Sequence, residues 1–99
     1  MSEKSPKRYR IVLRMSNIGE KVGPEAAQCI AEGFLARTWH ENVVCEYDVK
    51  SRSLILTAEN EYDNDGSALM REFAAEYSAC IRAEDMEDGD LVWESVKEV

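Results

Sequence analysis

The chain has 99 residues, of which 44% are hydrophobic and 32% charged, and its formal net charge is −8. This length corresponds to one domain, and the composition argues against extensive disorder. No apolar run approaches the roughly 20 residues that a membrane-spanning helix needs, so we expect a cytoplasmic protein. An acidic body repels nucleic-acid backbones, which makes direct nucleic-acid binding unfavourable and favours partners with basic surfaces.

The first part of the chain separates into a tail and a strand. Residues 1–7 are polar and include a proline, so we expect a flexible N-terminal tail, followed by a single domain over residues 8–99. Between residues 8 and 15, apolar side chains alternate with mainly basic ones. This period of two predicts a strand with one buried face and one basic face.

A helix and a hairpin follow. Pro24 suits the first turn of a helix, and apolar residues then recur every three or four positions, which predicts a helix ending near Trp39. Gly33 lies within this helix and predicts close packing against a strand. Two alternating runs over residues 43–49 and 54–58, joined by a short polar turn, predict a β-hairpin.

The last third of the chain contains a second helix and a final strand. An acidic loop over residues 59–66 precedes an amphipathic helix that is expected to begin near Asp65 or Ser67. A final strand is expected over residues 91–96. Two pairs of apolar residues compete for its inward face, Leu91 and Trp93 or Val92 and Val96.

The predicted order is strand–helix–strand–strand–helix–strand. This is the order of a ferredoxin-like βαββαβ sandwich, an α+β fold with a four-stranded antiparallel sheet and two helices on one face. Such a plan hosts many unrelated activities and therefore carries little information about function. It does predict that the loops gather in two groups, one at each end of the sheet.

One of these groups contains the only histidine, His40, together with several carboxylates for which no basic neighbour is expected. The spacing of Glu61, Asp63 and Asp65, with Glu72 further on, is close to that of a calcium-binding loop. Glutamate at the first position and a preceding strand depart from that pattern. The alternative is an acidic turn in which Asp65 or Ser67 caps the second helix. No other cofactor is indicated.

The three cysteines, Cys29, Cys45 and Cys80, are odd in number and form no Cys-x-x-Cys pair. We therefore expect small buried thiols rather than a metal or redox site.

Two surfaces are candidates for interaction. The uncovered face of the sheet lacks the aromatic residues on which RNA-binding domains of this topology stack bases, but it carries scattered apolar and charged groups that suit a protein partner or a homodimer. The residues assigned to this face are Arg10, Val12, Arg14, Ile55 and Trp93. The residues assigned to a second, acidic surface are Glu84, Asp85, Glu87 and Asp88.

No catalytic motif is present, so the sequence favours a non-enzymatic protein-binding or regulatory module, such as an inhibitor or adaptor. It leaves two alternatives open. One is a calcium-binding module that uses the loop over residues 61–72, and the other is a small-ligand sensor or enzyme whose site lies at a dimer interface.

Overall fold

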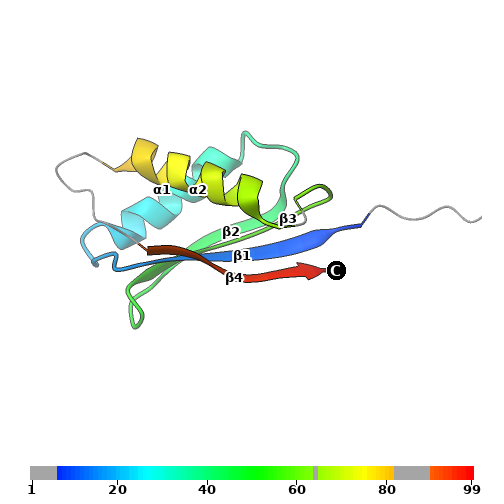
Figure 1. Cartoon of the computed structure of the whole chain (residues 1–99). Coiled ribbons are helices and arrows are strands. Elements are labelled where there is room, and N and C mark those ends of the chain that lie inside the picture. Colours follow the sequence, from blue (N-terminus) through cyan, green and yellow to red (C-terminus); the bar gives the residue numbers. More distant parts are fainter. Residues whose placement is uncertain (1–6, 64, 82–89) are drawn as a thin grey trace, which may run out of the picture.

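The computed structural model describes residues 7–63, 65–81 and 90–99. These residues form an α+β domain in which two helices lie on one face of a four-stranded antiparallel sheet (Figure 1). The strand order is β2-β3-β1-β4. The elements are β1 (Tyr9–Ser16), α1 (Gly23–Phe34), β2 (Glu41–Asp48), β3 (Ser53–Asn60), α2 (Ser67–Cys80) and β4 (Asp90–Glu98). In the described part of the chain, neither helix combines the length and apolar character of a membrane span.

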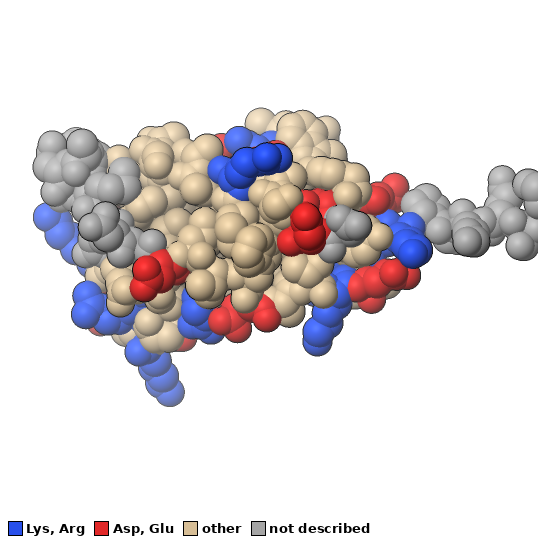
Figure 2. Space-filling view, in the orientation of Figure 1, with Lys and Arg blue, Asp and Glu red and all other residues tan. Residues whose placement is uncertain are grey.

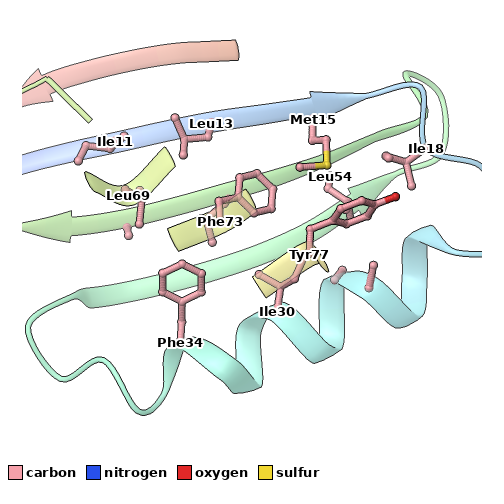
Figure 3. Close-up of a cluster of buried hydrophobic side chains, with 14 of the residues drawn as sticks. Ile11, Leu13, Met15, Ile18, Ile30, Phe34, Leu54, Leu69, Phe73 and Tyr77 are labelled. Atoms are coloured by element: carbon pink, nitrogen blue, oxygen red, sulfur yellow. The ribbon is translucent and has the colours of Figure 1, made fainter. Parts of the chain in front are cut away.

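The core lies between the sheet and the helices (Figure 3). Alternate residues of β1 and β3 point toward the helices, because side chains of a strand alternate between its two faces. The helices contribute the residues of their apolar stripes. The largest fully buried apolar side chains are Ile11, Leu13, Ile18, Ile30, Phe34, Leu54, Leu56, Leu69 and Phe73.

Helix α1 ends at Phe34, so the prediction that it continues to Trp39 is wrong. The chain beyond it forms successive turns, in which the N–H of Arg37 donates to the carbonyl of Phe34 and the N–H of His40 donates to that of Arg37. The apolar period breaks at Leu35, which is 78% exposed. These turns carry Trp39 and His40 to the end of the sheet.

A β-bulge resolves the ambiguity of the last strand. The register between β1 and β4 shifts after Val12, so that Trp93 lies opposite Leu13 and Val96 lies opposite Ile11. The extra residue places both on the helix-covered face, because a bulge inserts one residue into one strand only. A strict period of two cannot describe such a strand. The assignment of Trp93 to the uncovered face is therefore wrong.

Cys29 of α1 and Cys80 of α2 form a disulfide bond, so the prediction of buried thiols is wrong for these two residues. Each lies on the side of its helix that faces the other helix, which no spacing in the sequence could reveal. Cys45 is a free thiol on β2, and burial raises its pKa to about 12. A thiol with such a pKa is unreactive at neutral pH.

Gly33 has a different role from the predicted one. A Cβ atom on this residue would lie 2.1 Å from the carboxylate of Glu76 on α2, so Gly33 makes room for a second helix and not for a strand. The close approach to a strand occurs instead at Gly23, where a Cβ atom would meet the ring of Tyr47.

Candidate binding site at the histidine end

The loops gather in two groups, as the predicted plan requires. At one end, the N–H of Ile18 in the β1–α1 loop donates to the carbonyl of Arg52 in the β2–β3 turn. At the other end, the segment over residues 35–40 meets the segment over residues 60–66 and the first turns of α2. We call this second group the histidine end, because His40 lies at its centre.

The imidazole of His40 is buried, and both of its nitrogen atoms have a partner. Nε2 lies 2.6 Å from a carboxylate oxygen of Glu72, and Nδ1 lies 3.3 Å from the amide nitrogen of Asn60. The amide oxygen of Asn60 accepts hydrogen bonds from the backbone N–H groups of Tyr62 and Asp63, at 3.2 and 2.8 Å. These two bonds fix which way the amide points.

This orientation determines the tautomer of His40. The Asn60 amide presents its N–H₂ group to Nδ1, and an N–H₂ group can only donate. Nδ1 must therefore accept, and the proton of the neutral imidazole lies on Nε2, from which it is donated to Glu72. The geometry holds His40 in one orientation and, for the neutral ring, in one tautomer.

Arg37 completes this network on its helix side. Its guanidinium lies 3.5 Å from Glu72 and 2.5 Å from Glu76, and it also lies over the ring of Phe34. Near the start of β1, Arg8 pairs with Glu41 and with Glu59. The prediction that carboxylates near His40 have no basic neighbours is therefore wrong.

The start of α2 is held by a buried aspartate. The carboxylate of Asp63, which is 4% exposed as a residue, accepts hydrogen bonds from the backbone N–H groups of Ala68 and Leu69 at 3.1 and 2.9 Å. These N–H groups have no partner within the helix, so a carboxylate stabilises them and the positive end of the helix. Asp65 bonds the N–H and hydroxyl of Ser67. The acidic turn thus caps the helix, but mainly through Asp63.

An open pocket of about 420 Å³ lies on the surface of the histidine end. Two aromatic side chains line it, Trp39 and Tyr62, and each is 51% exposed. The His40 ring lies behind them, with ring-centre distances of 5.8 Å to Trp39 and 6.2 Å to Tyr62. The remaining lining residues are Thr38, Glu41, Asn60 and Glu61.

The phenol of Tyr62 has a raised pKa. Partial burial is the main cause, and the nearby carboxylates of Glu72 and Asp63 add to it, while a side-chain hydrogen bond with Trp39 acts in the opposite direction. Tyr62 therefore stays neutral at physiological pH, and its ring is tied both to Trp39 and to the His40 network.

The predicted calcium ligands do not converge. Asp63 bonds the start of α2, Glu72 bonds His40 and Arg37, and Asp65 bonds Ser67. Glu61 instead lines the pocket. Within the described ranges, no group of three or more histidine, cysteine, aspartate or glutamate side chains is placed to hold a metal ion. Calcium binding stays a prediction.

The uncovered face of the sheet carries apolar side chains that are interspersed with polar and charged ones. The register places Thr57 between Val44 and Val12 in one row across the sheet, and places Arg14 between Ile55 and Val92 in the next. Arg10 pairs with Glu59, and Arg14 with Glu94. Figure 2 shows basic and acidic side chains interleaved along the sheet side of the molecule. The arginines of this face are thus already neutralised within the chain.

The second predicted surface, formed by Glu84, Asp85, Glu87 and Asp88, lies outside the described residues.

Sequence reasoning missed the pocket. It treated Trp39 as a helix end and did not single out Tyr62, although both residues flank the ends of predicted elements. One signal in the sequence could have revealed it. Trp39 and Tyr62 lie in two connecting segments that the predicted fold brings to the same end of the sheet.

Comparisons of the chain with protein-family models, with curated proteins and with solved structures give no match. Function is therefore argued from the residues and their arrangement.

Proposed function

We propose that this chain is a small non-enzymatic protein-binding module whose partner docks at the histidine end. The observation that supports the proposal is that two half-exposed aromatic side chains, Trp39 and Tyr62, come from separate segments and line one pocket. Tryptophan and tyrosine are the residues that most often dominate the binding energy of protein interfaces. Exposed apolar side chains grouped in this way are typical of an interaction site.

The structure around the pocket supports the same function. Both aromatic side chains are held by partners behind them, so little side-chain freedom is lost when a partner binds. The net charge of −8 speeds encounters with basic partners. An acidic module that occupies a basic surface of its target would act as an inhibitor or adaptor.

Site-specific cross-linking tests this proposal. A photo-reactive phenylalanine analogue in place of Thr38, an exposed residue of the pocket lining, is irradiated in lysate from the source cells, and the adduct is identified by mass spectrometry. We expect one dominant partner, whose capture is abolished in the double variant W39A/Y62A. The variant W93A is the matched control, because Trp93 is also half exposed but lies on β4. Equal capture by wild type and W39A/Y62A would contradict the proposal, as would the absence of any adduct.

A second candidate interaction is a homodimer through the uncovered sheet face. The internally paired arginines and the apolar side chains of Val12, Val44, Ile55 and Val92 favour contact with the same face of a second copy. Sedimentation of the variants V44K and V49K tests it, since both valines are exposed but Val49 lies outside the sheet. Dissociation by V44K alone supports the dimer, and a monomeric wild-type protein rules it out.

The strand order β2-β3-β1-β4, antiparallel throughout, supports the finer assignment of a ferredoxin-like arrangement, which we retain as a proposal. The Cys29–Cys80 bond favours an oxidising environment. Such an environment differs from the cytoplasm that we expect from the sequence, and the cytoplasmic location stays a prediction.

A further inference from the structure

The pocket at the histidine end combines aromatic rings with negative charge. Its lining contains the two half-exposed rings of Trp39 and Tyr62 and the carboxylates of Glu41 and Glu61, and among the described residues no lysine or arginine lines it. The face of an aromatic ring attracts cations, and tryptophan does so most strongly. A nearby carboxylate adds a counter-ion for the same ligand.

The two carboxylates differ in what they can offer. Glu41 already pairs with Arg8, so its negative charge is largely neutralised within the chain. Glu61 is exposed, and in the part of the chain that the structure describes no ion pair or hydrogen bond of its side chain is present. Its carboxylate is thus the one that can serve a ligand in the pocket.

The aromatic walls are preformed. The Tyr62 ring is held on one side by His40, and its backbone N–H is bonded to the Asn60 side chain. The Trp39 ring also contacts the ring of His40, with 5.8 Å between the ring centres. A ligand therefore meets rings that are already in place, which lowers the entropic cost of binding.

We infer that this pocket binds one cationic side chain of the partner protein, an arginine guanidinium in preference to a lysine ammonium, at the Trp39 and Tyr62 rings with Glu61 as its counter-ion. Arginine is preferred because its planar group stacks on aromatic rings and can meet a carboxylate with two parallel hydrogen bonds. This inference rests on the proposed protein-binding function and names the group that the partner contributes.

The probe is Nα-acetylarginine amide, compared with Nα-acetyllysine amide and with the neutral citrulline analogue. Each is titrated into the full chain, labelled with ¹⁵N, while the two indole N–H resonances are followed. Trp39 reports on the pocket, and Trp93 is an internal control on β4. We expect the Trp39 signal to shift in a saturable way, with a dissociation constant on the order of millimolar, whereas Trp93 stays unchanged. Citrulline amide should bind at least about tenfold more weakly, since it lacks the charge.

Matched variants assign the counter-ion. E61Q should weaken arginine amide binding about two- to fivefold, the range of an exposed ion pair. E20Q makes the same charge change in the loop at the opposite end and should have no effect. Equal binding of the arginine and citrulline amides would overturn the inference, as would equal weakening by E61Q and E20Q or an unmoved Trp39 signal.

The titration with arginine amide and the cross-linking experiment can give different outcomes, and these distinguish the two proposals. If a partner is captured through Trp39 and Tyr62 but arginine amide neither binds nor competes, the protein-binding function stands and the cationic ligand is wrong. If arginine amide binds at Trp39 but no partner depends on the pocket, the cationic site stands and the protein-binding function is wrong.

Discussion

The histidine end and the uncovered sheet face both carry paired charges, but they use them differently. At the histidine end, the polar atoms of His40, Asn60 and Asp63 are buried, and each has a defined partner. On the sheet face, Arg14 and its partner Glu94 remain partly exposed to water. Buried polar groups are costly when a partner is lost, whereas exposed pairs contribute little. The histidine end should therefore behave as one rigid unit and the sheet face as independent contacts.

The largest expected effect concerns the covalent link behind the histidine end. The Cys29–Cys80 bond joins α1 to α2 across a sequence separation of 51 residues. Arg37 follows α1 in the chain, and Glu72 lies within α2. Its loss in C29S/C80S should lower the free energy of unfolding by about 4 kcal/mol, because the unfolded chain gains freedom. Urea denaturation measures this change. The control C45A removes a thiol without a cross-link, and an equally large loss in C45A would contradict the account.

The next largest effect should come from the buried cap. D63N keeps the size of the side chain but replaces one acceptor oxygen by a donor that faces a helix N–H group. We expect a loss of about 2 to 3 kcal/mol in the free energy of unfolding, the value of charged hydrogen bonds to a buried site. D65N is the control on the same loop, because Asp65 is exposed. Similar losses for both variants would show that the cap is not at Asp63.

Glu59 is intermediate between the two regions, because it lies on the sheet face yet its side chain is only 9% exposed. Hydrogen bonds from Arg10 and Asn42 are the main reasons that its pKa is lowered. A lowered pKa in the folded state stabilises the protein above the unfolded-state pKa, and this stabilisation is lost as the pH falls through the folded-state value. E59Q should therefore cost about 1 kcal/mol at neutral pH and progressively less in acid. A pH-independent difference from wild type, measured by thermal melting, would contradict the assignment.

The smallest effect should come from the exposed pair. R14Q removes the contact with Glu94 and should lower the free energy of unfolding by about 0.5 kcal/mol or less. Added salt should reduce even this difference, because exposed charges are screened. A loss comparable to that of D63N would mean that the two regions do not differ in the way proposed.

The sequence allowed the order of the elements and the grouping of their loops to be predicted, because hydrophobic periodicity reports on which face of each element is buried. It could not resolve β4, where the bulge before Val96 interrupts the period of two. Nor could it pair Cys29 with Cys80 or Arg37 with Glu76, since these contacts depend on how two helices pack.

The candidate site was predicted only in part. His40 and the acidic loop were expected at the same end, and they are found there. The carboxylates were predicted to be metal ligands. That prediction did not consider that the buried N–H groups at the start of a helix and a buried imidazole both require hydrogen-bond partners. Asp63 and Glu72 meet those requirements. The exposed aromatic residues gave no periodic signal, because they lie in turns.

The central claim is that the network around His40 is rigid and holds the walls of the pocket in place. The proton position on its imidazole tests this most directly, through long-range ¹H–¹⁵N correlation spectra of the neutral ring at mildly alkaline pH. Our account predicts a single tautomer with the proton on Nε2, donated to Glu72, while Nδ1 accepts from Asn60. A proton on Nδ1, or an averaged mixture of both tautomers, would contradict it.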